Sequence, residues 1–257
     1  MTESLNSVLS IDTRDAIRLV EIDRKPVNAL PTSAWIALAE AFREADEDTS
    51  IRSVVLHGQG GRFCAGADIN ELTNPDPDAD RAKMLTVVEQ AAHAIRSFRV
   101  PVIAAIDGPA HGGGLELALA CDIRVASPRA TFAAAGVNMG LIASVASLME
   151  VAGDTVARRM LLTGDRVDAT QAQAWGIVTE QSDDPFETAI SLAERIAAKP
   201  PLAIEATKAA LNGVTELSRS EHNAALKAAF RGLADSEDHG EALAAFLDKR
   251  AGEFHRS

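Results

Sequence analysis

Two glycine-containing loops and one carboxylate are the residues of this 257-residue sequence whose types and spacing suit catalysis. The first loop, residues 62–69, has Gly66 between two alanines, and the second, residues 107–117, has three consecutive glycines shortly before Glu116. A helix that begins directly after such glycines leaves bare backbone N–H groups at its N-terminus, where negative charge is favoured. One N–H from each loop would bind the same oxygen in an oxyanion hole, worth about 3–4 kcal/mol per donor.

Each of these features also has a purely structural interpretation. The first loop can be an ordinary strand-to-helix turn in which Gly66 supplies a backbone conformation that other residues resist. The glycines at 112–114 can simply let a helix pack close to a sheet. Glu116 can stabilise the first turn of its helix, or it can be a partly buried general base among leucines. The residues alone leave both interpretations open.

Searches for other catalytic motifs find no match. Phe63 stands where a dinucleotide-binding loop starting at Gly58 would need its last glycine, and the sequence has neither a phosphate-binding P-loop nor the serine-hydrolase pattern G-x-S-x-G. The six histidines lack metal-ligand spacing, so we expect no metal site. His111, beside the glycines, is more readily explained as a hydrogen-bonding loop residue than as a catalyst.

Composition narrows the class of protein. A formal net charge of −12 argues against a general nucleic-acid binder, and 47% hydrophobic residues can build a sizeable core. The two cysteines, Cys64 and Cys121, are too few for a disulfide scaffold. The N-terminus lacks the basic and apolar regions of a signal peptide, and charges interrupt the most apolar tract, 100–126. We therefore expect a cytoplasmic protein without a membrane span.

Hydrophobic periodicity indicates how these loops are positioned. Short apolar runs predict strands at 17–22, 53–56, 102–106 and 122–125, with a turn at 12–15. Helical spacing predicts helices beginning near Thr32 and covering 84–95 and 115–120. The loop at 73–80 is either a lid over a pocket or a solvated acidic segment.

From about residue 154 the pattern becomes helical throughout. The predicted helices are 154–162, 184–198, 202–212, 217–234 and 237–248. We expect an α/β core over residues 1–190 followed by a helical region over 191–257.

Four stretches of the sequence together resemble the enoyl-CoA hydratase/isomerase (crotonase) superfamily. They are residues 24–30, 63–69, 108–123 and 236–250, and they occur in the family's order over nearly the whole chain. The two middle stretches are quite specific, and the outer two support them.

The resemblance implies a crotonase-like α/β fold, which is a spiral of ββα units with a C-terminal helical trimerisation region. Trimers of this family often pair into hexamers. The resemblance also implies acyl-CoA thioester substrates and fatty acid metabolism. No cofactor is expected, because coenzyme A is part of the substrate, and no nucleic acid partner is implied.

The resemblance assigns roles to particular residues. The N–H groups of Ala67 and Gly113 correspond to the oxyanion hole, and Glu116 corresponds to the carboxylate that activates water in family hydratases. The positions that match substrate and CoA contacts are Arg24, Lys25, Ala65, Asp68, Ile69, Gly112, Phe230 and Lys249. Among these, Arg24 and Lys25 match contacts to the CoA phosphates. Phe230 and Lys249 match positions that reach CoA from the tail helices, often those of a neighbouring subunit. A solvated charge or a core aromatic is the alternative for these four.

The sequence departs from the family at the second acid. Family hydratases usually carry another glutamate in a later loop, where Gly136 stands here. The following loop, 140–147, also lacks the usual glycines, and the chain has no tyrosine to replace the acid. Asn138 and Ser144 are polar but poor proton donors at neutral pH.

Three functions fit this pattern. The first is an enoyl-CoA hydratase, a hydro-lyase with Glu116 as its single acid/base group. The second is an enoyl-CoA isomerase or another crotonase reaction, although family isomerases commonly place their carboxylate in the slot of Gly136. The third is an acyl-CoA-binding protein with little catalysis.

Overall fold

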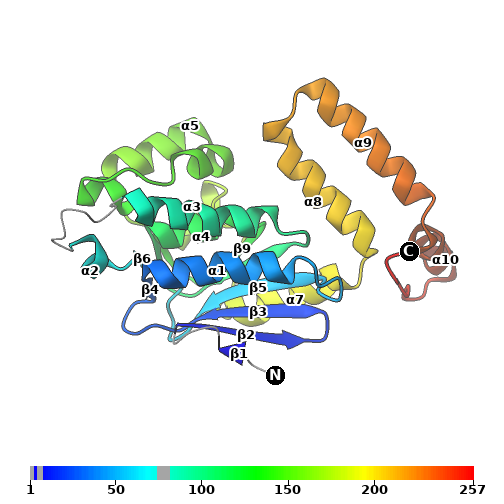
Figure 1. Cartoon of the computed structure of the whole chain (residues 1–257), viewed down its shortest axis with the longest axis horizontal. Helices are drawn as coiled ribbons and strands as arrows, with labels where there is room; N and C mark the ends of the chain where they lie inside the picture. Colours follow the sequence, from blue (N-terminus) through cyan, green and yellow to red (C-terminus); the bar gives the residue numbers. More distant parts are fainter. Residues whose placement is uncertain (1–2, 5–7, 74–81) are drawn as a thin grey trace.

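The computed structural model describes residues 3–4, 8–73 and 82–257. Helices lie over a curved sheet, and the last helices of the chain extend away from this body to one side (Figure 1). The loop predicted at 73–80 lies outside the described residues except for Thr73.

The main sheet has seven strands in the order β1-β2-β3-β5-β7-β9-β12. Their bounds are Glu3–Ser4, Leu9–Arg14, Ile17–Ile22, Ser53–Gly58, Val102–Ile106, Ile123–Ala126 and Glu180–Gln181. The first three strands pair antiparallel, and all pairs from β3 onward are parallel. All four predicted strands are present, within one or two residues of their expected ends.

The turn expected at 12–15 is wrong in its extent. Asp12 and Arg14 belong to β2, which pairs with β3 through Asp12↔Leu19 and Arg14↔Ile17. The chain reverses only at Asp15, which has a positive φ of 53°. Only one of the six residues of β2 is buried and the last two are exposed, so the strand lacks the apolar run by which the other strands are predicted.

Short strands beside the main sheet complete a repeating unit. β4 (Ala29–Leu30) pairs parallel with β6 (Gly66–Ala67). β10 (Thr131–Ala133) pairs with β8 (Pro109–His111) and β11 (Val167–Asp168). Along the chain, a main-sheet strand, a short strand and a helix therefore follow one another repeatedly. This confirms the predicted crotonase-like spiral of ββα units.

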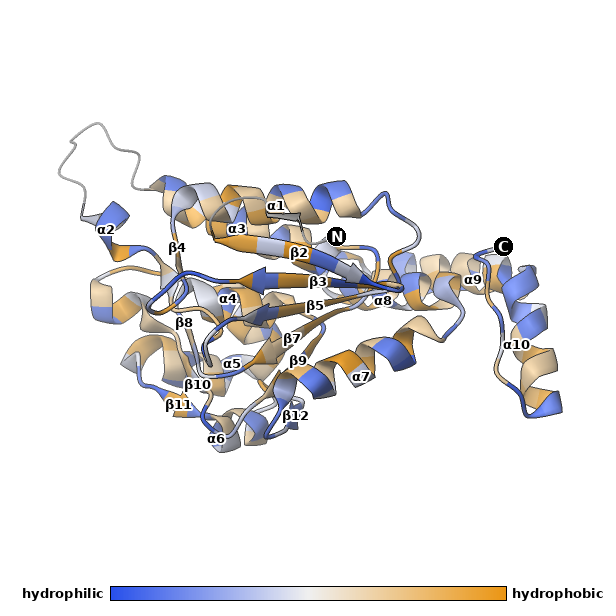
Figure 2. Ribbon diagram, turned by 90° about the horizontal axis from the view of Figure 1, so that it is seen from below, coloured by the Kyte–Doolittle hydropathy of each residue, from blue (hydrophilic) through white to orange (hydrophobic). Residues whose placement is uncertain are grey.

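Helices cover both faces of the main sheet. The body helices are α1 (Thr32–Ala45), α2 (Ile69–Leu72), α3 (Ala82–Ser97), α4 (Gly113–Ala120), the 3₁₀ turn η1 (Ala135–Met139), α5 (Val145–Thr163), α6 (Ala169–Ala174) and α7 (Pro185–Ala197). Alternate residues of β7 face opposite sides: Ala104 packs with α1, α3 and α4, whereas Ile103 packs with α7. Figure 2 shows α1 and α3 on one side of the sheet and α7 on the other. Because both faces are covered, β7 is wholly buried.

Helix α5 is longer than the predicted helix at 154–162. It begins at Val145 and contains a break at Gly153, where φ is 76° and ψ is 170°. Before the break, Leu148 is buried and Val151 and Ala152 pack against the core, whereas Val145 and Met149 are exposed. The helical signal of this half is therefore short and is interrupted by exposed apolar residues.

Three helices form an arm at the end of the chain: α8 (Pro201–Glu216), α9 (Arg219–Ala234) and α10 (Glu237–Asp248). They match the predicted helices closely, and α9 and α10 project away from the body (Figure 1). α7 crosses the predicted boundary at residue 190 and packs against the sheet, and the division into two regions stays a prediction. None of the described helices combines the length and apolarity needed to cross a membrane.

Candidate active site

The two glycine-containing loops touch each other. A Cβ atom added to Gly66 would lie 2.8 Å from the His111 carbonyl oxygen and 2.9 Å from the Gly113 nitrogen. A Cβ added to Gly113 would lie 2.9 Å from the Trp35 ring, and Gly66 has a φ of 99°. Both interpretations of these glycines therefore hold together. They permit close packing, and that packing brings the amide of Gly113 next to the residue that precedes Ala67.

Backbone hydrogen bonds fix the loops in register. The Cys64 amide donates to the Pro109 carbonyl at 3.0 Å, and the His111 amide donates to the Cys64 carbonyl at 3.1 Å. The Gly112 amide bonds to the Ala133 carbonyl at 2.9 Å, which ties the second loop to β10. Gly113 then opens α4, at a position where an amide has no intrahelical partner.

Ala67 is held on the other side by β4. The amides flanking it along the loop are bonded: Ala65 donates to the Val27 carbonyl at 3.2 Å, and Asp68 donates to the Leu30 carbonyl at 2.9 Å. The Leu30 carbonyl also accepts from the indole nitrogen of the buried Trp35 at 3.0 Å. Trp35 thus supports both loops, because its ring lies against Gly113.

Glu116 lies in the first turn of α4, one turn after Gly113, and is half-buried. Its Oε1 accepts a hydrogen bond from the Ser147 hydroxyl on α5. Its Oε2 is buried and has no hydrogen-bond partner among the described residues. Buried carboxylate oxygens are normally satisfied, so an unpaired one near the two loops makes Glu116 a candidate to interact with a ligand.

The site reasoned from the sequence did not include Ser147 or Arg96. Arg96, near the end of α3, donates from Nη2 to the Ser147 hydroxyl at 3.1 Å and from Nη1 to Glu150 at 2.9 Å. The sequence predicts a loop at 140–147, but Ser147 lies in α5, which begins at Val145. No short motif joins residues 96, 116 and 147, because three separate helices bring them together.

The predicted CoA contacts fall into three groups. Arg24 is paired inside the protein: its Nη2 meets Asp68 Oδ2 at 2.7 Å, and its Nη1 donates to the Ala29 carbonyl at 2.7 Å. Asp68 also accepts from the Asn70 amide, and this bond, with the Arg24 pair, lowers the pKa of Asp68. Lys25 is exposed on the same loop.

The second group lines the two loops. Ala65 and Gly112 are half-buried, whereas Ile69 is 55% exposed at the start of α2. Ala65 and Gly112 directly precede the contacting glycines Gly66 and Gly113, so the structure brings these two residues together with Ala67, whereas Ile69 lies two residues beyond Ala67.

The third group, Phe230 and Lys249, lies on the arm. Phe230 is 72% exposed on α9, and Lys249 follows α10 in a left-handed conformation with φ of 54°. Figures 1 and 2 both show α9 and α10 at the opposite end of the molecule from α2. Within one chain these two residues are therefore separate from Ala67, Gly113 and Glu116.

Gly136, where the resemblance places the second acid, lies close to a backbone carbonyl. A Cβ at Gly136 in η1 would lie 3.1 Å from the Leu141 carbonyl oxygen. Asn138 points elsewhere and donates to the Gly164 carbonyl at 2.8 Å. The Ser144 hydroxyl is buried without a partner among the described residues, one turn before Ser147.

The remaining titratable groups near the loops have local explanations. His111 shares a 3.0 Å hydrogen bond with the Thr131 hydroxyl, and burial lowers the pKa of the imidazole. Burial raises the pKa of Cys64 and of Cys121 to about 12, so both thiols stay protonated and unreactive. The described residues contain no group of three or more His, Cys, Asp or Glu side chains that would hold a metal ion.

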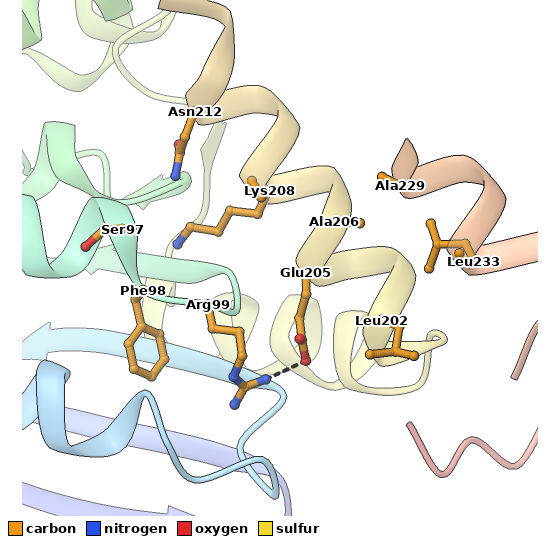
Figure 3. Close-up of a pocket in the computed structure, with 12 residues that line it drawn as sticks. Ser97, Phe98, Arg99, Leu202, Glu205, Ala206, Lys208, Asn212, Ala229 and Leu233 are labelled. Atoms are coloured by element: carbon orange, nitrogen blue, oxygen red, sulfur yellow. Dashed lines mark hydrogen bonds and ion pairs between the residues drawn. The ribbon is translucent and has the colours of Figure 1, made fainter. Parts of the chain in front are cut away.

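A separate hollow of about 460 Å³ lies between α8, α9 and the end of α3 (Figure 3). Arg99 and Glu205 form a 2.6 Å ion pair there, and Lys208 points from α8 toward the body. The Lys208 ammonium donates to Asp122 at 2.8 Å and to the Val100 carbonyl at 3.0 Å. These cations are already paired, and none of the predicted site residues lines the hollow.

Comparison with known proteins adds relatives along nearly the whole chain. Its sequence is 34% identical over 254 residues to a 2,3-dehydroadipyl-CoA hydratase of Escherichia coli, covering 96% of this chain and 98% of that protein. It is 32% identical to a probable enoyl-CoA hydratase of Bacillus subtilis, with the same coverage of both chains.

Solved structures agree. An enoyl-CoA hydratase from Bacillus anthracis superposes with a TM-score of 0.93 at 28% identity, covering 98% of this chain and all of that one. The Pseudomonas aeruginosa protein DspI gives a TM-score of 0.92 at 33% identity, with 97% of each chain covered. The sequence model of the enoyl-CoA hydratase/isomerase family matches residues 12–257. The chain therefore belongs to the enoyl-CoA hydratase/isomerase family.

Proposed function

We propose that this protein is a hydratase that adds water across the 2,3 double bond of an acyl-CoA thioester. The observation that carries the proposal is the buried, unpaired Oε2 of Glu116, one turn along α4 from the amide of Gly113. The family and the hydratases among its relatives support the same class of enzyme.

The chemistry follows from this arrangement. The thioester oxygen accepts hydrogen bonds from the amides of Ala67 and Gly113. Glu116 Oε2 takes a proton from water while the water oxygen bonds to the β-carbon, and the π electrons move onto the thioester oxygen as an enolate. The protonated carboxyl then returns that proton to the α-carbon as the enolate collapses. One water molecule is added, and Glu116 ends as it began.

The position of the single carboxylate distinguishes this proposal from the alternatives. An isomerase moves a proton between two carbons, and its carboxylate commonly occupies the slot that Gly136 fills. An acyl-CoA binder without catalysis needs the two amides but no ionisable group. The position of Glu116 on α4 therefore favours hydration over isomerisation, and its unpaired Oε2 favours hydration over binding alone.

Phe230 and Lys249 lie on the arm, away from the two loops of their own chain. Both residues would contact coenzyme A only if α9 and α10 of one protomer reach the loops of another, as in a homotrimer or hexamer. Lys25, exposed beside the Arg24 pair, is the better candidate for a CoA phosphate.

A substrate screen tests the function. A hydratase removes the conjugated absorbance of a short 2-enoyl-CoA, and Glu116→Gln reduces that rate by at least 10²-fold, within the range of about 10²–10⁴ for an acid/base group. Glu116→Gln should retain thermal stabilisation by a saturated acyl-CoA, which shows that binding survives. Creation of conjugation from a 3-enoyl-CoA identifies an isomerase instead. Stabilisation by acyl-CoA without either reaction identifies a binder.

A further inference from the structure

A chain of hydrogen bonds across three helices ends on Glu116. Arg96 of α3 donates to the Ser147 hydroxyl of α5 at 3.1 Å, and Ser147 donates to Oε1 of Glu116 on α4. Ser147 is 4% exposed, so the link is protected from water. The other terminal nitrogen of Arg96, Nη1, donates to Glu150 at 2.9 Å.

The direction of these bonds is determined by the chemistry of the groups. A guanidinium only donates, so the Ser147 oxygen is the acceptor toward Arg96. The Ser147 hydroxyl therefore donates its single proton in a hydrogen bond to the carboxylate oxygen Oε1. Oε1 is therefore committed, and Oε2 is the oxygen left to exchange a proton.

We infer that Ser147 and Arg96 are positioning residues, which orient the Glu116 carboxylate with Oε2 presented to the reacting water. This inference rests on the proposed hydration. An enzyme with two carboxylates has a second group to hold the water, but this chain has Gly136 in that slot. Accurate orientation of one carboxylate is correspondingly more important, because misplacement by about 1 Å costs on the order of 10²-fold in rate.

Two shape-matched substitutions test the role of the hydroxyl. Ser147→Thr keeps the hydroxyl and adds a methyl group. Ser147→Val has nearly the same shape as the threonine variant but carries a methyl group in place of the hydroxyl. We expect Ser147→Val to lower kcat for hydration of a short 2-enoyl-CoA 10- to 100-fold with KM within threefold of wild type. We expect Ser147→Thr to retain kcat within about threefold of wild type, which separates the role of the hydroxyl from a packing role.

Two further variants guard against a folding artefact. Ser127→Ala removes another buried hydroxyl, one with no partner among the described residues, and should leave kcat unchanged. Arg96→Met is the alternative test if Ser147→Val does not fold, because the Arg96 side chain is 34% exposed. We expect this variant to lower kcat about 3- to 10-fold.

The possible results distinguish failure of the positioning role from failure of the proposed hydration. If wild type hydrates the substrate but Ser147→Val matches it, or if the threonine and valine variants lose equally, the positioning role is overturned while the proposed function stands. A rise in KM with kcat preserved also overturns it, because that result describes substrate binding. If wild type hydrates no 2-enoyl-CoA, the proposed function fails and this inference fails with it.

Discussion

Arg24 and Asp68, 44 residues apart in sequence, form a 2.7 Å ion pair directly beside Ala67. The other terminal nitrogen of Arg24 bonds to the Ala29 carbonyl, so one guanidinium joins the loop before β4 to the loop that carries the candidate oxyanion-hole amide. Asp68 in turn caps α2 through the Asn70 amide. A residue expected to bind the substrate's phosphates is thus also a brace for the first loop.

A double-mutant cycle measures the coupling energy between Arg24 and Asp68. We expect Arg24→Ala and Asp68→Ala each to destabilise the protein, with a coupling energy of about 1–2 kcal/mol because Arg24 is partly exposed. Urea unfolding of wild type, both single variants and the double variant supplies the four free energies. Strictly additive losses would show that the pair contributes nothing to stability.

The contact between the two glycine-containing loops predicts a severe effect at Gly66. Gly66→Ala combines a φ of 99° with overlap onto backbone atoms of His111 and Gly113, so it should force the loops apart. We expect a loss of about 1–3 kcal/mol in unfolding free energy and at least a tenfold fall in kcat. Both are measured by denaturation and by hydration of a 2-enoyl-CoA.

Gly176→Ala is the matched control for this experiment. Gly176 has a φ of 77°, but an added Cβ there has nothing within 4 Å. Its substitution therefore carries the backbone strain without the overlap, and kcat should be retained. Equal losses of activity at both positions would contradict the importance of the loop contact.

The missing second acid can be restored at its slot. Gly136→Glu and Gly136→Gln place side chains of equal size where a Cβ meets the Leu141 carbonyl oxygen at 3.1 Å, so both carry the same steric cost. We expect the glutamate variant to hydrate 2-enoyl-CoA about tenfold faster than the glutamine variant, because a second acid/base group assists proton transfer. Equal rates would mean that η1 holds the new carboxylate away from the reacting water.

Acid stability should depend on His57. Burial against Phe186, together with Arg14, lowers the pKa of His57 to about 4, although Glu21 lies 3.8 Å away. The unfolded chain binds a proton near pH 6.5 and the folded chain near pH 4, so the free energy of unfolding falls as pH decreases through this window.

The variant His57→Gln removes that titration. Between pH 7 and pH 5 wild type should lose about 1–2 kcal/mol more stability than the variant, measured by urea unfolding at both values. Parallel losses in the two proteins would show that His57 is protonated equally in the folded and unfolded states.

The regular part of the fold was accessible from the sequence because burial leaves a periodic signal. The residues of β7 are buried on both faces and form one apolar run, which predicted the strand exactly where it lies. β2 lacks such a run because only one of its six residues is buried, and β4 and β6 are two residues long. The first half of α5 has a weak helical signal, because exposed Val145 and Met149 interrupt its short buried stripe.

The candidate site shows a similar division. Glycines and a carboxylate at fixed spacing within one loop and one helix pointed to 66–67 and 113–116. Contacts between separate helices leave no such spacing, so the Arg96–Ser147–Glu116 chain and the Arg24–Asp68 pair emerged only from the structure. Phe230 and Lys249 lie far from the two loops within one chain, and their assignment to CoA stays a prediction.

The contact between Gly66 and Gly113 also limits which substitutions this sequence tolerates. At both positions any side chain would run into the opposite loop or into Trp35, so neither residue can change by small steps. The slot at residue 136 has no comparable restriction, because the atoms that a new side chain would meet there need to yield by only a few tenths of an ångström. A chain descended from this one would therefore vary at residue 136 more readily than at either of the two contacting glycines.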